Sequence, residues 1–494
     1  MKQVYNPFLP LNTYIPDGEP HVFGDRVYLF GSHDKESGES YCMLGYEVWS
    51  APVDDLTNWT CPGTSYHASQ DPNFSPDRSF MYAPDVVCGN DGRYYLYYCL
   101  AGWKGIGGYA GPISVAVATK PDGPYSYYGH VQYPDGSPFD EPVLFDPALI
   151  NDDSTIRLYY GANAPKGLDI TKWNKWWASS ILAKIFSRDK SDFTEEGTIL
   201  GARQVVLEDD MLTVQGPVQK LTIEMSKKDK KDGHDFFEGA SIRKIDQTYY
   251  FIYSSQNNHE LCYATSAFPD KDFVYQGVLV STGDVGFEGR LAKDRVQATG
   301  TTHGSIEKIG DDWYVFYHRL THGSDYSRQA CAEKLQLDNT GNFSQVPVTS
   351  CGLNGKPLSA IGTYPAGIAC YLRQGKMPHI SNKIIPDIPQ IISYENGQMI
   401  TNIVPKTTIG FKYFEFEQSK YQIILRIRGQ GKGHFTISLD EFGKEIVGSV
   451  RIEESAEWSS FNGEIATKIG SQALFFHFEG AGALELLSFK IERL

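Results

Sequence analysis

The sequence predicts an all-β protein, in which a five-bladed β-propeller is followed by a C-terminal antiparallel β-sandwich. The first observation behind this prediction is an aromatic strand that recurs at intervals of 63–67 residues, with one longer interval of 92. A repeat of this length in β-rich sequence is typical of propeller blades. The five strands read VYLF (27–30), YYLYY (94–98), RLYY (157–160), YYFIY (249–253) and WYVFY (313–317).

The second observation is a polar residue that stands ten to twelve residues ahead of a fixed point in each strand. These residues are Asp17, Asp85, Asp146, Glu238 and His303. Because a propeller repeats its blades around one axis, a residue at the same place in every repeat comes to that axis. We therefore expect these five side chains to converge and to form the functional site.

Composition agrees with this fold and limits the partners. The 494 residues indicate two or more domains. The 31 Tyr, 27 Phe, 48 Gly and 26 Pro favour β-structure with many turns. The formal net charge of −15 argues against nucleic acid and anionic membrane surfaces, and it suits a neutral partner such as a sugar.

The location is predicted to be cytoplasmic. No run of about 18 apolar residues predicts a membrane span, and the first residues lack the apolar core of a signal peptide. The eight cysteines are scattered without metal-binding spacing, as expected in a reducing compartment.

Within each repeat, a strand leads into a tight polar turn and the aromatic strand follows. The turns carry Asp, Asn or Gly at the tip, which is typical of hairpins. A third strand with alternating apolar residues often follows, as at 113–119 and 261–266. The fifth blade is expected to end near 331–338, so the propeller is predicted over residues 1–345.

The long interval predicts an insertion between Gly161 and His234. It contains KWNKWW (172–177), whose tryptophans are Trp173, Trp176 and Trp177. These rings either stack on a sugar or pack the insertion onto the propeller. The Lys-rich stretch 225–233 is expected to be a solvated loop.

The remaining chain predicts a linker and a second domain. Residues 346–369 are rich in Pro and Gly and predict a linker or crossover. Residues 370–494 contain six short alternating segments separated by Gly turns, which favours an antiparallel sandwich. The segments are 410–416, 421–429, 433–440, 445–452, 473–480 and 484–494.

An acidic axis is compatible with three kinds of site. Paired carboxylates supply the acid and the base for glycoside cleavage. Carboxylates also bind Ca²⁺, or they stabilise hairpins without any reaction. The repeat pattern alone leaves these three alternatives open.

The local motifs separate the alternatives, because together they resemble glycoside hydrolase family 43. The resemblance covers all five blades in order, over about residues 1 to 345, and implies a five-bladed propeller that hydrolyses xylose or arabinose linkages with inversion. The motifs are IPDGEPHVFGDRVYLFGSHD (15–34), YAPDV (82–86), FDPALI (145–150), FFEGASIRKIDQTYYFIYS (236–254) and THGSIEKIGDDWYVFYHR (302–319).

The resemblance implies roles for three carboxylates. Asp17 matches the general base that activates water, and Glu238 matches the general acid that protonates the leaving oxygen. Asp146 matches the carboxylate that orients the acid and holds its pKa. Glu19 is an alternative base, because the motif reads PDGEP where many members have Asp-Pro directly; the spacing to HVF (21–23) favours Asp17.

Further residues are expected around the sugar. Asp85 either contacts substrate or bonds backbone amides, and Arg328 bonds sugar hydroxyls or the carboxylates, or else forms a surface ion pair. His303 resembles the central histidine that contacts water or a structural Ca²⁺ ion; a core histidine without metal is the alternative. Three residues at the end of the first aromatic strand and just after it are expected to line the sugar subsite: Phe30, His33 and Asp34.

The C-terminal domain resembles family 6 carbohydrate-binding modules through YQIILRIRG (421–429), ISLD (437–440) and ALFFHFEG (473–480). Such a domain either binds sugar or serves as a structural partner. Trp458 is its only tryptophan, which favours the structural role, because sugar-binding surfaces present several aromatic rings.

The sequence therefore predicts an inverting, exo-acting α-L-arabinofuranosidase and/or β-D-xylosidase on xylan- or arabinan-derived oligosaccharides. No cofactor is required for this chemistry, and the expected partner is the oligosaccharide. An endo-acting arabinanase or xylanase is one alternative. A non-catalytic, carbohydrate-binding propeller is another.

Overall fold

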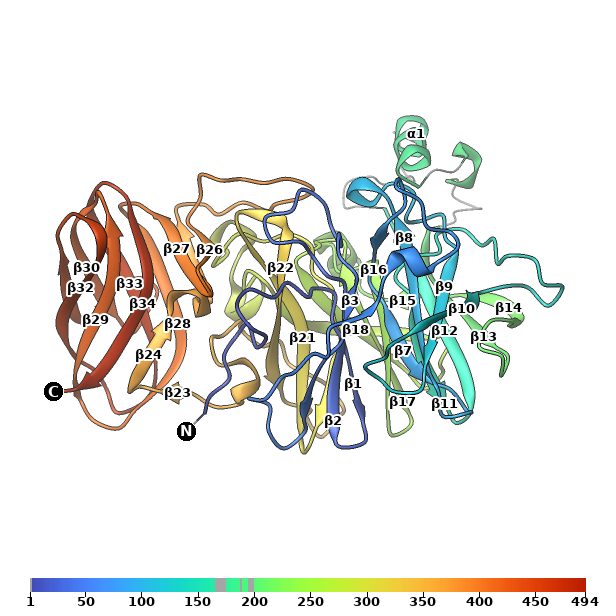
Figure 1. Cartoon of the computed structure of the whole chain (residues 1–494), viewed down its shortest axis with the longest axis horizontal. Coiled ribbons are helices and arrows are strands. Elements are labelled where there is room, and N and C mark those ends of the chain that lie inside the picture. Colours follow the sequence, from blue (N-terminus) through green and yellow to red (C-terminus); the bar gives the residue numbers. More distant parts are fainter. Residues whose placement is uncertain (1, 165–174, 187–188, 194–199) are drawn as a thin grey trace.

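A computed structural model describes residues 2–164, 175–186, 189–193 and 200–494. Five separate sheets of three to five strands form the propeller, and one large sheet forms the C-terminal domain beside it (Figure 1). This arrangement confirms the predicted fold class.

The first three blades are built almost entirely from antiparallel pairs. Blade one has β1 (Glu19–Phe23), β2 (Arg26–Phe30) and β4 (Trp49–Pro52), beside a small pair of β3 (Tyr46–Glu47) and β5 (Thr64–Tyr66). Blade two has β6 (Phe80–Met81), β7 (Asp85–Cys88), β8 (Tyr94–Ala101), β9 (Ile113–Ala118) and β10 (Ser126–His130). Blade three has β11 (Ala148–Asp152), β12 (Thr155–Ala162), β13 (Gly201–Leu207) and β14 (Val214–Lys220).

The last two blades complete the ring. Blade four has β15 (Ile223–Glu224), β16 (Phe236–Ile245), β17 (Thr248–Ser255), β18 (Glu260–Ser266) and β19 (Phe273–Ser281). Blade five has β20 (Ile306–Ile309), β21 (Asp312–Thr321) and β22 (Ser324–Leu335). A parallel bridge between Gly18 and Gly304 joins the first blade to the fifth, and the Asn6 side chain donates to the Ala332 carbonyl at 2.9 Å.

Each predicted aromatic strand is the second strand of its blade, paired with the innermost strand by a short hairpin. These second strands are buried over most of their length, because they have partners on both edges and neighbouring blades on both faces. The five repeated polar residues therefore lie at the N-terminal ends of the innermost strands β1, β7, β11, β16 and β20. This placement is what brings them to the axis.

The long interval contains the helix α1 (Lys175–Phe186), which lies above the propeller in Figure 1. Leu182 and Phe186 anchor it in an apolar cluster with residues of blades two and three. Trp173 lies outside the described residues, as does the Trp176 side chain, so both alternatives for these rings stay predictions. Trp177 is 42% exposed.

The Lys-rich stretch predicted as a loop contains a short helix, α2 (Lys227–Asp232). Ser226 caps its first turn by accepting from the Asp229 N–H at 3.1 Å, and Gly233 ends it in the left-handed conformation. The caps and the Lys228–Asp232 pair stabilise a helix that composition alone does not suggest.

The C-terminal domain is a single twelve-stranded sheet wrapped around one apolar core. Its strands are β23 (Leu358–Ser359), β24 (Gly362–Pro365), β25 (Tyr371–Gln374), β26 (Gln390–Tyr394), β27 (Gly397–Ile403), β28 (Thr407–Phe416), β29 (Lys420–Gly429), β30 (Lys432–Ser438), β31 (Ile446–Ile452), β32 (Ser455–Ala466), β33 (Gly470–Ala481) and β34 (Leu484–Arg493).

All six predicted strands of this domain are present. The prediction missed β25, β26, β27 and β32. In β32 the side chains are mostly polar and exposed, so they show no apolar alternation. The segment 346–369, predicted as a linker or crossover, contributes β23 and β24 to the sheet.

The C-terminal domain packs directly on blades four and five. An apolar cluster shared by the two domains includes Val296, Tyr317, Tyr371 and Phe475. The buried Arg319 of β21 donates to the carbonyl oxygens of Gly367 (2.6 Å) and Ala369 (3.1 Å). Such a desolvated contact fixes the two domains relative to each other.

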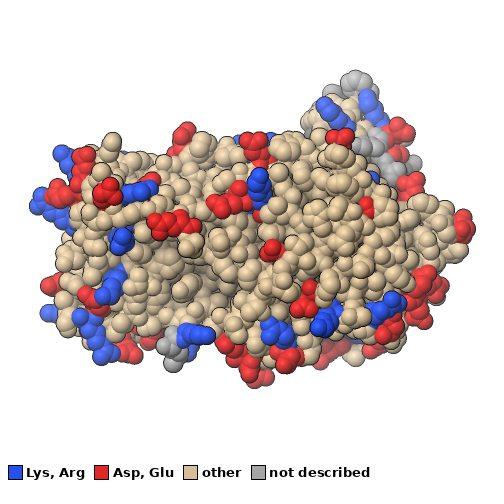
Figure 2. Space-filling model, in the orientation of Figure 1, with Lys and Arg blue, Asp and Glu red and all other residues tan. Residues whose placement is uncertain are grey.

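Charge is distributed over the edges of the molecule. Figure 2 shows acidic and basic side chains interspersed around the sandwich and the lower rim of the propeller, with a broad uncharged area in the middle of this face. Neither helix in the described part of the chain is long and apolar enough to cross a membrane.

Candidate active site

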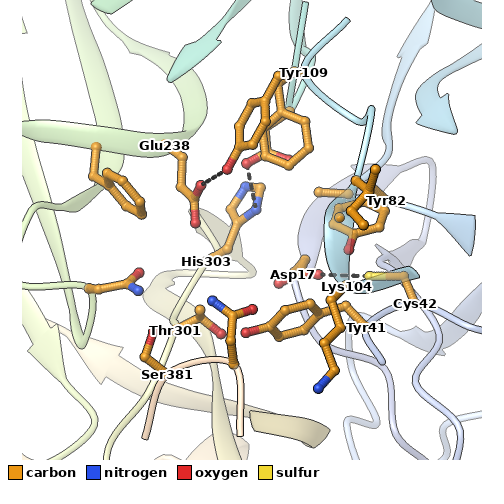
Figure 3. A pocket seen from close by; sticks show the side chains of 18 of the residues that line it. Asp17, Tyr41, Cys42, Tyr82, Lys104, Tyr109, Glu238, Thr301, His303 and Ser381 are labelled. Atoms are coloured by element: carbon orange, nitrogen blue, oxygen red, sulfur yellow. Dashed lines mark hydrogen bonds and ion pairs between the residues drawn. The ribbon is translucent and has the colours of Figure 1, made fainter. Parts of the chain in front are cut away.

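A cavity of about 510 Å³ lies where the innermost strands begin, and all five blades contribute to its lining. Five of the predicted site residues line it: Asp17, Asp146, Glu238, His303 and Arg328. Figure 3 shows Glu238 and Asp17 on opposite sides of His303. The repeat in the sequence thus does bring three carboxylates together from three different blades.

The backbone turns sharply at two of these carboxylates. Asp17 has φ +58° and Asp146 has φ +47°, each just before its innermost strand begins. Aspartate tolerates this left-handed region better than most residues, but the conformation still costs free energy. Such local strain is common where a fold directs a functional side chain into a cavity.

Asp17 is held as a carboxylate. It is only 5% exposed, and its Oδ1 accepts from Arg328 Nη1 at 2.9 Å. Burial alone would raise its pKa, but the positive charge of Arg328 outweighs burial and leaves the pKa below its ordinary value. Asp17 is therefore ionised at neutral pH.

Arg328 is fixed by a second carboxylate, Asp34. Its Nε and Nη2 donate to the two Asp34 oxygens at 2.8 and 3.0 Å, and its guanidinium lies 5.0 Å from the centre of the Tyr41 ring. Of the predicted roles for Arg328, the structure shows the carboxylate contact, because its bonds go to Asp17 and Asp34.

His318 positions the Asp17 backbone, a role that sequence reasoning did not identify. Its Nε2 lies 2.8 Å from the Thr301 carbonyl, so Nε2 carries the proton and Nδ1 accepts from the Asp17 N–H at 3.2 Å. Burial, aided by the charge of Arg328, lowers the pKa of His318 to about 3. A neutral imidazole is the form that this pair of hydrogen bonds requires.

Glu238 has the opposite electrostatic environment. Burial, reinforced by the charge of Asp17, raises its pKa to about 8. Its nearest hydrogen-bond donor is the Tyr109 hydroxyl, 3.4 Å from Oε2 (Figure 3). No cation in the described part of the cavity forms an ion pair with it, so Glu238 keeps its proton at neutral pH.

Asp146 shares this buried environment with Glu238. Its Oδ2 accepts from the N–H of Gly239, the residue after Glu238, at 3.1 Å. Burial first, and then the charges of Glu238 and Asp17, raise the pKa of Asp146. The Asp146–Glu238 pair therefore holds a proton at neutral pH, while Asp17 does not.

Gly239 is required at its position by geometry. It has φ +67°, and a Cβ added there would lie 3.0 Å from the ring of His303. The absence of a side chain lets Glu238, Asp146 and His303 approach one another closely.

Glu19, the alternative base, is not among the described residues that line the cavity. It is 1% exposed, and its Oε2 accepts from Arg243 Nη2 and Ser241 Oγ, both at 3.1 Å. Burial raises its pKa, although the Arg243 guanidinium opposes the shift. Glu19 therefore lies away from the cavity wall that Asp17 lines.

Asp85 does not fit the predicted substrate contact. Its side chain is fully buried, and its two oxygens bond His21 Nε2 at 2.6 Å and the Leu149 N–H at 2.7 Å. It therefore ties blades one, two and three together. This is the alternative interpretation of the residue, a strand-start aspartate that bonds backbone amides.

The residues predicted to line the sugar subsite, Phe30, His33 and Asp34, are also absent from the described cavity wall. Phe30 is buried in the apolar cluster between blades one and two, His33 Nδ1 lies 3.0 Å from the Gly45 carbonyl, and Asp34 anchors Arg328. The prediction failed because β2 is the second strand of its blade, so the chain that leaves it lies one strand away from the axis.

The walls come instead from loops that the repeat does not mark. Tyr41, Tyr82 and Tyr109 supply aromatic surface, and Lys104 and Asn258 supply polar groups. Aromatic surface with a few polar groups is typical of sugar sites. None of these residues recurs at a fixed position, so no signal in a single sequence distinguishes them.

The residues around His303 do not form a calcium cage. Among the described residues, His303 Nε2 and Glu19 Oε1 are buried without hydrogen-bond partners, and the two atoms lie 4.0 Å apart. Ca²⁺ prefers six to eight oxygen ligands, and the charge of Arg243 beside Glu19 opposes a divalent cation. His21 and Asp85 also lie close to Glu19, but they are bonded to each other. Water must supply most of the ligands of any ion at this place.

Three comparisons relate this site to known proteins. A sequence model described as "Glycosyl hydrolases family 43" matches residues 5–343. A curated protein of Thermoclostridium stercorarium named "Xylosidase/arabinosidase" is 40% identical over 99% of this chain and 99% of its own length. The family match ends before the C-terminal domain, whose resemblance to family 6 modules stays a prediction.

Solved structures also match. A family 43 enzyme from Xanthomonas citri in complex with xylose aligns with a TM-score of 0.52 and 25% identity, over 70% of this chain and 93% of its own. A β-xylosidase/α-arabinofuranosidase from a compost metagenome, in complex with xylotriose and in a calcium-free form, has the same TM-score and identity over 68% and 96%.

Proposed function

Because the chain belongs to glycosyl hydrolases family 43, it is a glycoside hydrolase, and we propose that it removes terminal α-L-arabinofuranosyl and/or β-D-xylosyl units from xylan- or arabinan-derived oligosaccharides by inversion. The observation that carries the proposal is the division of proton affinities in one cavity. Asp17 is ionised, and Glu238 is protonated. An inverting glycosidase needs one carboxylate in each of these states.

The cavity shape supports exo action. Its walls come from all five blades, from Lys184 of α1 and from Ser381 and Asn382 of the C-terminal domain. A pocket surrounded in this way holds the end of a chain, whereas an endo-acting enzyme needs a groove through which a polymer can pass.

The proposed reaction is a single displacement. Asp17 takes a proton from a water molecule, whose oxygen attacks the anomeric carbon from the face opposite the leaving group. Glu238 gives its proton to the glycosidic oxygen as the carbon–oxygen bond breaks. The product sugar has the inverted configuration. At this point Asp17 carries a proton and Glu238 is ionised, and proton exchange with solvent restores the starting state.

Asp146 acts through Glu238 rather than on the substrate. Its hydrogen bond from the Gly239 N–H fixes it beside the acid. Because the two carboxyl groups share one low-dielectric site, a charge on either disfavours a charge on the other. The two carboxyl groups therefore hold a proton between them up to the transition state.

A panel of p-nitrophenyl glycosides tests the proposal. We expect turnover of the α-L-arabinofuranoside, the β-D-xylopyranoside or both, and proton NMR at early times should show the inverted anomer first. The matched hexopyranosides serve as controls. Retention of configuration, or hydrolysis confined to internal bonds of arabinan or xylan, would contradict it.

The rate is expected to depend on pH in a defined way. The proton on Glu238 is present below about pH 8 and is lost as the pH rises through that value. The charge on Asp17 is lost only when the pH falls below the ordinary aspartate value of about 3.9. A plot of kcat/KM against pH should therefore be flat through neutral pH. Well above pH 8, kcat/KM should fall tenfold for each pH unit. An alkaline limb centred near 5 would contradict the assignment of Glu238.

We propose that calcium takes no part in these steps, and that an ion beside His303, held mainly by water, is structural. The carboxylates alone complete the reaction, and Arg243 already compensates the charge of Glu19. Exhaustive chelation should therefore change kcat on an aryl glycoside by no more than about twofold, while lowering the melting temperature modestly. A tenfold loss of kcat that calcium restores and magnesium does not would show that the ion is catalytic.

A further inference from the structure

The C-terminal domain contributes to the mouth of the cavity. The segment 375–389, between β25 and β26, leaves the sandwich and crosses above β22, where it appears as the orange connection in Figure 1. Ser381 and Asn382, at the middle of this segment, line the cavity together with Thr301 and Tyr41 of the propeller. Figure 3 shows Ser381 beside Thr301.

Backbone hydrogen bonds fix this segment on the propeller. On one side, Thr299 donates its N–H to the Pro378 carbonyl at 3.1 Å, and Ile380 donates back to Thr299 at 2.6 Å. On the other side, Ile385 donates to the Gly323 carbonyl at 2.7 Å. The segment is therefore bonded like an added strand between two parts of blade five, rather than lying loosely over it.

A buried carboxylate secures the segment at the cavity itself. Asp325 accepts from the Asn382 N–H at 3.0 Å and from the Thr301 N–H at 3.2 Å, and it also bonds the Tyr41 hydroxyl. Its three partners all line the cavity. One side chain thus joins the propeller wall and the C-terminal segment at this point.

The side chains of Ser381 and Asn382 are available to a ligand. Both residues are exposed, and within the described residues neither the Ser381 hydroxyl nor the Asn382 amide has a hydrogen-bond partner. Their backbone is already fixed, so binding does not have to order the backbone of this segment. Exposed, unpaired polar groups on a rigid backbone are suited to recognise hydroxyl groups.

The depth of Ser381 and Asn382 in the cavity determines which part of the substrate they contact. Asp17 and Asp146 are buried, so the sugar that is cleaved off lies deep, beside them. Ser381 and Asn382 lie at the exposed mouth, where the leaving group of an exo-acting enzyme extends. We infer that Ser381 and Asn382 hydrogen-bond the leaving-group sugar, so that the C-terminal domain sets the enzyme's preference for that sugar. This inference rests on the proposed function.

The substitution Asn382→Gly tests this inference without disturbing the backbone. Asn382 has φ +54°, which glycine adopts freely, so only the amide is removed. The kcat/KM of the double variant S381A/N382G should be measured on the p-nitrophenyl glycoside of the preferred sugar and on a disaccharide with the same sugar at its non-reducing end. Asn396→Gly, in the exposed turn between β26 and β27, is the matched control.

We expect kcat/KM on the disaccharide to fall by about three- to tenfold for each hydrogen bond lost, mainly through KM. The aryl glycoside, whose leaving group offers no hydroxyls in this arrangement, should change by no more than about twofold. Equal losses on both substrates, or no loss on either with an active wild type, would overturn the inference. A wild type that hydrolyses neither substrate would instead overturn the proposed function on which it rests.

Discussion

Replacing Glu238 with glutamine is expected to lower kcat by about 10²–10⁴-fold on a disaccharide. Glutamine has the shape of glutamic acid but cannot give a proton to the leaving oxygen. A p-nitrophenolate leaves without protonation, so the aryl glycoside should lose much less activity. The measurement is the ratio of the two kcat values in Glu238→Gln and in the wild type.

Glu333→Gln is the matched control for this variant. Glu333 is also buried, and burial raises its pKa to about 8 as well. Its oxygens bond Asn6, Tyr317 and Thr349 near the end of the propeller, and it is not among the described residues of the cavity wall. We expect its substitution to affect stability but not the ratio. Equal losses on both substrates in Glu238→Gln would remove the acid assignment.

Replacing Asp17 with asparagine should reduce kcat by about 10²–10⁴-fold on both substrates alike. Activation of water is needed whatever the leaving group, so a better leaving group does not rescue the loss. A second effect is expected on the residual activity. Because the charge of Asp17 contributes to the raised pKa of Glu238, the alkaline limb of the pH profile should move to lower pH in this variant.

Glu19→Gln distinguishes the two candidate bases. Glutamine still accepts the hydrogen bonds of Ser241 and Arg243, although the buried guanidinium loses its counter-charge and the melting temperature should fall. The kcat should stay within about tenfold of the wild type, since the change alters no proton transfer. A larger loss in Glu19→Gln than in Asp17→Asn would transfer the role of base to Glu19.

The number of blades and the main carboxylates could be predicted because both depend on local spacing. A hairpin with a buried second strand favours apolar, β-branched or aromatic residues in that strand and a polar turn before it. The start of each innermost strand then falls at a nearly constant distance upstream. Asp17, Asp146 and Glu238 were found by counting along the chain, without knowledge of any long-range contact.

The properties that turn these positions into a site depend on contacts between distant residues. Arg328, 311 residues away from Asp17 in the chain, sets its charge, and His318 holds its backbone. Asp85 occupies an equivalent position in its repeat, yet its oxygens are taken by His21 and Leu149. Spacing cannot separate a carboxylate that faces a cavity from one that joins blades.

The sequence by itself determined the all-β class, the five repeats and the carboxylates at the axis, because periodic spacing fixes where each strand begins. Only the tertiary structure decided which carboxylates are ionised and which residues form the cavity walls. It also showed that Ser381 and Asn382 reach the cavity from the C-terminal domain. The physical reason is that burial, charge and hydrogen bonding are set by neighbours in space. In this chain those neighbours come from all five blades and from a domain that follows them.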